Sequence, residues 1–133
     1  MNAHDAEIIR EMIRHENEQI NNRVSWLMTF QGLLFACLGF VWDKPMSDRL
    51  IVGLCILGIL VSVLCFFTLH AATTAILLLY DSWAQGRPTD YHGPDVVGLP
   101  PPKVRLFRYL AAWILFPLVL AVSWVFVWYV KKG

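Results

Sequence analysis

The sequence predicts an all-α polytopic membrane protein with three transmembrane helices, of which the first two are long enough to extend into the cytoplasm. The chain of 133 residues is 57% hydrophobic and only 16% charged, whereas soluble domains carry about 25% charged residues. Three long segments, 24–42, 50–80 and 109–130, contain no Asp, Glu, Lys or Arg. Because a bilayer core needs roughly 20 apolar residues per helix, these segments exclude a soluble single domain.

The first helix is expected to begin in the polar segment 1–23 and to run without a break into the first span, 24–42. No glycine or proline occurs between Ala3 and Gly32, so no helix break is indicated. Segment 1–23 also has an apolar face, with residues at helical spacing among charged side chains: Ile8, Ile9, Met12, Ile13 and Ile20. We therefore predict a cytoplasmic amphipathic helix continuous with the first span.

The second helix, 50–83, follows a short external loop, 43–49, and is longer than the bilayer requires. Its excess length would project about 20 Å beyond the membrane or force the helix to tilt strongly. The apolar residues 76–79 would be costly to expose to water, so the extension needs a partner. The amphipathic segment 1–23 can supply it by forming a short bundle; the alternative is that this segment lies flat on the lipid surface.

A Pro/Gly-rich cytoplasmic loop, 84–108, separates the second helix from the third span, 109–130, and residues 131–133 form an external tail. Lys103, Arg105 and Arg108 near the end of the loop are candidate basic residues. They suit anchoring to lipid headgroups, and the alternative is a phosphate-bearing ligand. Pro117 lies within the third span, where it predicts a kink; a break in the helix is the alternative.

The distribution of Lys and Arg predicts the orientation. Seven of these residues lie in the N-terminal segment and the long loop, against four in the first loop and the tail. Because cytoplasmic segments carry the excess of positive charge, we expect a multi-pass protein of the cell (inner) membrane with a cytoplasmic N-terminus and an external C-terminus. Aromatic residues near the ends of the spans are expected at headgroup depth: Trp26, Trp42, Trp83, Trp124, Trp128 and Tyr129.

One face of the first helix is polar or small along its whole length. At about 100° per residue, the residues that share this line are Glu7, Glu11, Arg14, Glu18, Asn21, Ser25, Thr29, Gly32, Ala36, Gly39 and Asp43. We call them the stripe. The small members could pack on a small face of the second helix that includes Cys55, Gly58 and Ser62. Alternatively, several copies could place the stripe around an axis.

In the second interpretation, the stripe lines a narrow conduit. The pore-lining candidates are Ser25, Thr29, Gly32, Ala36, Gly39 and Asp43. The candidates for a cytoplasmic mouth or ligand site are Glu7, Glu11, Arg14, Glu18, Asn21 and Asn22. Rings of acidic side chains favour cations, so a cation-conducting pore is the expected activity.

Other polar residues give no sign of an enzyme. Gln31 lies off the stripe, and an amide within a span usually bonds a neighbouring helix. The four histidines and three cysteines show no metal, disulfide or redox spacing. The sequence has no Gly-rich phosphate loop and no nucleophile elbow. We therefore predict no enzyme activity, no metal and no cofactor.

In size and layout the chain resembles the small three-span effectors of bacterial membranes, including those used in anti-phage (antiviral) defence. This resemblance implies a homo-oligomeric ion channel in the lipid bilayer, gated by a cytoplasmic ligand of nucleotide or oligonucleotide type. The expected function is such a channel. The alternative is a non-conducting membrane anchor or regulatory subunit that binds a protein partner in a larger complex.

Overall fold

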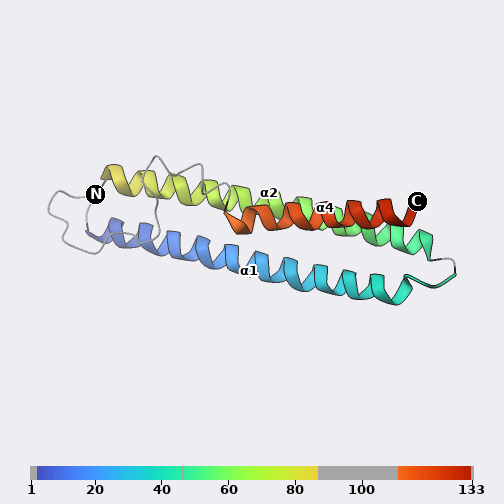
Figure 1. Cartoon of the computed structure of the whole chain (residues 1–133). Coiled ribbons are helices and arrows are strands. Elements are labelled where there is room, and N and C mark those ends of the chain that lie inside the picture. Colours follow the sequence, from blue (N-terminus) through green and yellow to red (C-terminus); the bar gives the residue numbers. More distant parts are fainter. Residues whose placement is uncertain (1–2, 46, 87–110, 133) are drawn as a thin grey trace.

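Three long helices make up the part of the protein that the structure describes (Figure 1). The computed structural model describes residues 3–45, 47–86 and 111–132. Its helices are α1 (Ala3–Val41), α2 (Asp48–Gly86) and α4 (Ala112–Lys132). Each is long and apolar enough to cross a membrane. The predicted all-α class with three membrane-spanning helices is confirmed.

The two long helices exceed the thickness of a bilayer. α1 and α2 have 39 residues each, which corresponds to a length of about 58 Å, whereas the hydrocarbon core is about 30 Å thick. α4 has 21 residues and matches the core. Figure 1 shows α1 and α2 continuing past the beginning of α4, so the end of the molecule that holds the N-terminus is a two-helix extension.

Buried residues of α2 follow a seven-residue repeat along the whole helix. Intervals of three and four residues alternate through Ile51, Cys55, Gly58, Ser62, Leu69, Ala72, Ile76 and Trp83, with half-buried Cys65 and Leu79 at the intervening positions. On α1, the buried residues Ile20, Leu27, Gln31, Leu34 and Leu38 have the same spacing. This is the pattern of a coiled-coil seam, and it runs from the extension through the span.

An apolar cluster holds the extension together. Ile13 and Ile20 of α1 pack with Leu69, Ala72 and Ile76 of α2. The predicted bundle between the N-terminal segment and the second helix is therefore confirmed, and the alternative of a separate helix lying flat on lipid is wrong. The guanidinium of Arg10 lies 5.4 Å from the ring centre of Trp83, near the far end of the extension.

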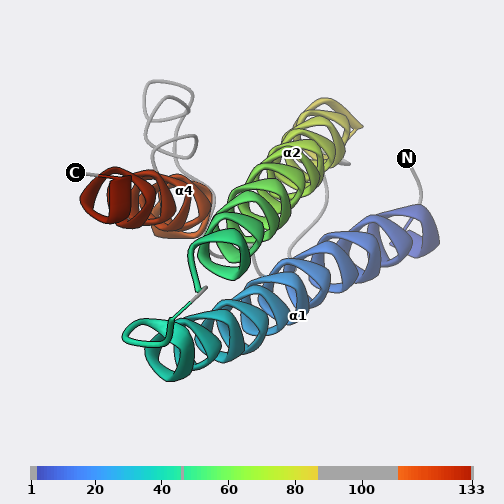
Figure 2. The same cartoon turned by 90° about the vertical axis from the view of Figure 1, so that its right-hand side faces the viewer.

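α4 packs chiefly on α2 and touches α1 little, as the end-on view in Figure 2 shows, with α2 between the other two helices. At the opposite end of the molecule from the extension, Lys131 Nζ donates to the carbonyl oxygen of Trp42 (3.2 Å) and lies 3.7 Å from a carboxylate oxygen of Asp48. The helix continues through the buried Pro117, so a helix break at this proline is wrong.

Two of the aromatic residues expected at headgroup depth, Trp83 and Trp124, are buried within the protein at 2% and 0% exposure. Their depth in the bilayer stays a prediction. Trp26, Trp128 and Tyr129 are exposed on the surface of the protein.

Candidate functional site on the outer face of α1

Gln31 joins all three helices. Its Nε2 donates to the carbonyl oxygen of Gly58 and to Ser62 Oγ, both at 2.9 Å. Its Oε1 accepts from Trp124 Nε1 at 2.6 Å. The side chain is only 2% exposed, and a buried amide in a low-dielectric setting requires such partners. The interpretation of Gln31 as a link to neighbouring helices is confirmed.

The small face of α2 is occupied by Trp124. Any side chain at Gly58 would overlap the indole of this tryptophan. Phe35 of α1 stacks on the other side of the indole, with ring centres 4.4 Å apart and planes inclined by 11°. The small residues of α2 therefore accept α4 and the Gln31 amide, and they leave no room for the stripe of α1.

The stripe lies on the side of α1 opposite to the buried seam. All its members are exposed: Glu7, Glu11, Arg14, Glu18, Asn21, Ser25, Thr29, Gly32, Ala36, Gly39 and Asp43. Among the described residues, no atom beyond the adjoining residues and backbone of α1 itself lies within 4 Å of the position that a Cβ would occupy at Gly32 or Gly39. Docking of the stripe onto α2 within one chain is therefore wrong.

Bulky apolar side chains border the stripe within the span. Trp26, Leu33 and Phe40 are among the exposed large side chains of α1. The arc opposite the stripe is less uniform than expected, since Ile8, Met12 and Phe30 of that arc are also exposed. The surface presented by α1 is thus a line of small or polar residues with apolar margins.

The candidate mouth residues fall on the extension. Glu7, Glu11, Arg14, Glu18, Asn21 and Asn22 are all exposed there. Asp43 lies in the turn that follows α1, at the other end of the molecule. Within the span, Thr29 Oγ1 donates to the Ser25 carbonyl oxygen at 3.0 Å, so its hydroxyl is satisfied by its own helix. Lys103, Arg105 and Arg108 lie outside the described residues.

In ranges 3–45, 47–86 and 111–132, no group of three or more His, Cys, Asp and Glu side chains could hold a metal ion. The cysteines there are free thiols. His70 is exposed and its ring lies against Phe66, with ring centres 6.2 Å apart.

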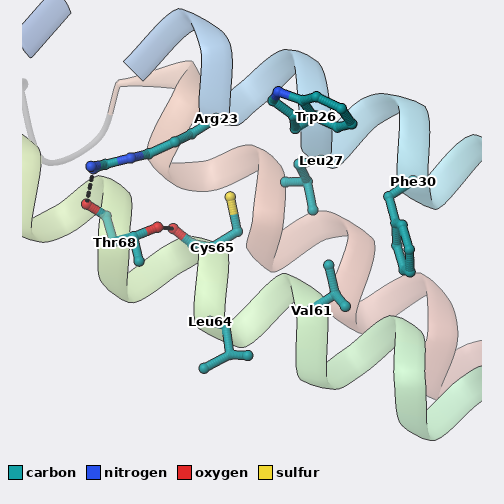
Figure 3. Close-up of a pocket in the computed structure, with 8 residues that line it drawn as sticks. All are labelled: Arg23, Trp26, Leu27, Phe30, Val61, Leu64, Cys65 and Thr68. Atoms are coloured by element: carbon teal, nitrogen blue, oxygen red, sulfur yellow. Dashed lines mark hydrogen bonds between the residues drawn. The ribbon is translucent and has the colours of Figure 1, made fainter. Parts of the chain in front are cut away.

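A groove of about 380 Å³ runs along one side of the α1–α2 seam (Figure 3). It is lined by Arg23, Trp26, Leu27, Phe30, Val61, Leu64, Cys65 and Thr68. At one end, Arg23 Nη1 donates to the Thr68 carbonyl oxygen at 3.1 Å. No sequence pattern indicates this groove, because its position depends on which side of the seam α4 covers.

Trp124 was likewise not predicted as the partner of Gln31. A signal was present: Gln31 is the single side-chain amide within the predicted spans 24–42, 50–83 and 109–130. An indole N–H within a span needs an acceptor, so a pairing of the two could have been considered.

Fold and surface together define a small three-span membrane protein whose first helix presents an unpartnered polar line. The chain matches the model of the octameric membrane protein family (8xMP) over residues 4–79. This match covers more than half of the chain, which belongs to that family. Neither a curated protein nor a solved structure matches the chain. The protein is thus a membrane protein that self-associates into a homo-oligomer.

Proposed function

We propose that the protein is a homo-oligomeric cation channel in which the stripe of α1 faces the central axis. The observation that carries this proposal is the exposure of the stripe along the whole of α1, with no partner for Gly32 or Gly39 in the described part of the chain. Small side chains facing lipid gain nothing, whereas at the axis of a symmetric assembly they leave the lumen open. The family name, octameric, supports an assembly of eight copies.

A ring of eight α1 helices would enclose an open lumen. Packed helices lie about 8–10 Å apart, so eight of them would have their axes about 10–13 Å from the centre. Subtracting a helix radius of about 5 Å leaves a lumen about 10–16 Å across. Such a lumen is wider than the narrow conduit expected from the sequence, so ions would pass hydrated and selection would rest on charge.

The charges along the stripe favour cations. Glu7, Glu11 and Glu18 are exposed on the extension, with Arg14 the one base among them, and Asp43 lies at the opposite end. In a symmetric ring each position is repeated in every copy, so three acidic rings outweigh one basic ring at the extension. Rings of carboxylates concentrate cations and exclude anions.

Replacing Gly32 with Trp tests the proposal. In the assembly, a ring of indoles at this position would fill most of the lumen and lower cation flux by about tenfold or more. The flux would be measured with purified protein in liposomes. The matched control is Gly53→Trp, since Gly53 of α2 also faces open space but lies off the stripe. Equal flux in the two variants would rule out the pore.

Gating belongs to the same proposal. On the Lys and Arg distribution, the extension lies in the cytoplasm, where Asn21, Asn22 and the acidic residues are exposed. The effector-type layout supports a nucleotide or oligonucleotide ligand at this face. Flux that is unchanged by nucleotides and short oligonucleotides added on the side of the extension would remove this part of the proposal.

The second candidate function is a non-conducting anchor or regulatory subunit of a larger complex. A hollow of about 290 Å³ on the extension favours it, with a lining of Ile8, Glu11, Met12, His15, Glu16 and Leu79 that a partner protein could contact. A partner that co-purifies in fixed ratio with the wild-type protein, and is lost from Met12→Glu, would support this function. That the chain is not an enzyme stays a prediction.

A further inference from the structure

The two sides of the α1–α2 seam differ. On one side, α4 covers the seam: Trp124 reaches Gln31 and packs against Gly58 and Phe35. On the other side lies the open groove, where Trp26 is 76% exposed and Phe30 40% exposed. A helix covers one side of the seam, and the other side presents apolar side chains with nothing over them in the chain that the structure describes.

Placing the stripe at the axis fixes which surfaces meet around a ring; this step rests on the proposed function. The stripe and the seam lie on opposite sides of α1, so α2 would lie radially outside α1. The two flanks of the seam then face the two neighbouring copies. In a cyclic ring the contact is head-to-tail between two different surfaces, so the α4 flank of one copy meets the groove flank of the next.

The groove and the outer face of α4 lie at the same depth along the membrane normal. α4 runs in the same direction as α1, with Trp124 level with Gln31 and Lys131 at the level of Trp42. The groove extends from Arg23 to Phe30 on α1, so it lies level with α4 residues before Trp124. Rotation about the membrane normal preserves depth. The α4 residues available to the groove of the next copy are therefore those between Leu115 and Val122.

The shapes also agree. The outer face of α4 is hollowed between its larger side chains, over a lining of Leu115, Leu118, Val119, Val122, Ser123, Phe126 and Val127. Val119 and Val122 are 60% and 67% exposed. A hollow over valines can receive the exposed rings of Trp26 and Phe30, which line the groove in Figure 3. In lipid, helices pack closely where large apolar side chains of one helix fit against smaller side chains of another.

We propose that the outer face of α4, around Val119 and Val122, packs into the α1–α2 groove of the next copy and forms the repeating interface of the ring. Each α4 would then contact two seams, its own through Trp124 and its neighbour's through the valines. The occupant of the groove is thus a second copy of this chain.

Cysteine cross-linking in native membranes tests the interface. The variant carries Cys37→Ala and Cys55→Ala, keeps Cys65 in the groove, and receives Val119→Cys; a short bis-maleimide is then added. Head-to-tail contact predicts a ladder of covalent species that rises through dimer and trimer towards the closed ring. The matched control replaces Val119→Cys with Phe67→Cys, which is exposed on the face of α2 opposite the seam and so points away from both neighbours; it is expected to remain monomeric.

A second variant tests the same interface without a cross-linker, through the size of the assembly in detergent. Trp26→Ala should shift the assembly towards smaller species in detergent, whereas Phe67→Ala, on an α2 face away from the groove, should not. An unchanged assembly in Trp26→Ala, or covalent dimers without higher species, would overturn the proposal. A third result would also overturn it. If Cys65 forms no cross-link with a cysteine at position 118, 119 or 122, and phospholipid co-purifies with the wild type but not with Arg23→Gln, then lipid and not a second copy occupies the groove.

Failure of the pore and failure of this interface are distinguishable. A ladder from Val119→Cys together with equal flux in Gly32→Trp and Gly53→Trp would leave the interface standing and remove the channel. Loss of flux in Gly32→Trp without any ladder would have the opposite meaning.

Discussion

At the scale of single residues, the amide of Gln31 determines how the three helices meet. Its two ends bond α2 and α4 at once, in a region where apolar surroundings offer no other partners. The sequence predicted the role of Gln31, because a buried amide must find a partner. It did not predict the role of Trp124, since a tryptophan near the end of a span can face headgroups or the interior, and only the packing decides which.

Replacing Gln31 with Leu should destabilise the folded chain. The substitution removes three hydrogen bonds and leaves the indole N–H of Trp124 buried without an acceptor. We expect a loss of about 1–3 kcal/mol in the free energy of unfolding, measured by denaturant unfolding in micelles. Ser123→Ala is the control, because that hydroxyl bonds only the Val119 carbonyl of its own helix. Equal stability of the two variants would contradict the linking role.

Gly58 offers a sharper test of the contact with α4. Gly58→Ala introduces a methyl group that overlaps the Trp124 indole, so α4 must shift or the indole must leave its hydrogen bond. Such overpacking should lower stability by about 1–3 kcal/mol. Gly53→Ala adds the same methyl group in open space and should be neutral or slightly stabilising in a helix. A loss of stability at position 53 as large as at position 58 would argue against this packing.

At the scale of elements, the amphipathic N-terminal segment and the part of α2 that exceeds the bilayer thickness each cover the apolar face of the other. The sequence showed both, because apolar residues at helical spacing need cover in water. It did not show which faces would meet, since α2 is apolar nearly all round and its seven-residue repeat is hidden among other hydrophobic residues. In the structure, Ile76 is buried and Leu78 is exposed, which shows which face of α2 packs on α1.

Ile76→Ala should loosen the extension while leaving the spans intact. Ile76 is fully buried in the cluster with Ile13 and Ile20, and a change of this kind costs about 2–5 kcal/mol. Hydrogen exchange of backbone amides should therefore become faster in the first half of α1 and the last turns of α2. Leu78→Ala is the control, since this neighbour is 63% exposed. Protection unchanged in Ile76→Ala would mean that the extension is held by other contacts.

At the scale of the whole molecule, the arrangement of copies decides the function. The sequence predicted self-association from a stripe of polar and small residues and from a resemblance in layout, and membership of the octameric family supports it. The number of copies could not be predicted, because the angle between neighbours depends on the shapes of two flanks. Those shapes follow from the position of α4 beside the seam, which no residue pattern in the spans specifies.

Two acidic residues close together in the sequence test whether the stripe faces the axis, because only one of them belongs to the stripe. Glu18 is exposed on the stripe, whereas Glu16 lies on the side of α1 towards α2. Glu18→Gln should lower the ratio of cation to anion permeability by about twofold, because one ring of carboxylates is removed from the lumen. Reversal potentials under a salt gradient would measure the ratio. Glu16→Gln should leave it unchanged, and identical shifts in both variants would contradict an axial position for the stripe.

The uninterrupted seam between α1 and α2 has a mechanical consequence. Its repeat continues from the extension into the span with no glycine hinge and no proline on α1 before Gly32. A strict seven-residue period makes two helices behave as one supercoiled rod, which is stiff in bending and torsion. A force applied to the extension would therefore not dissipate at the bilayer surface. It would rotate the membrane-spanning part of each α1–α2 pair as a rigid body. In a ring of such pairs, the copies would then open or close together.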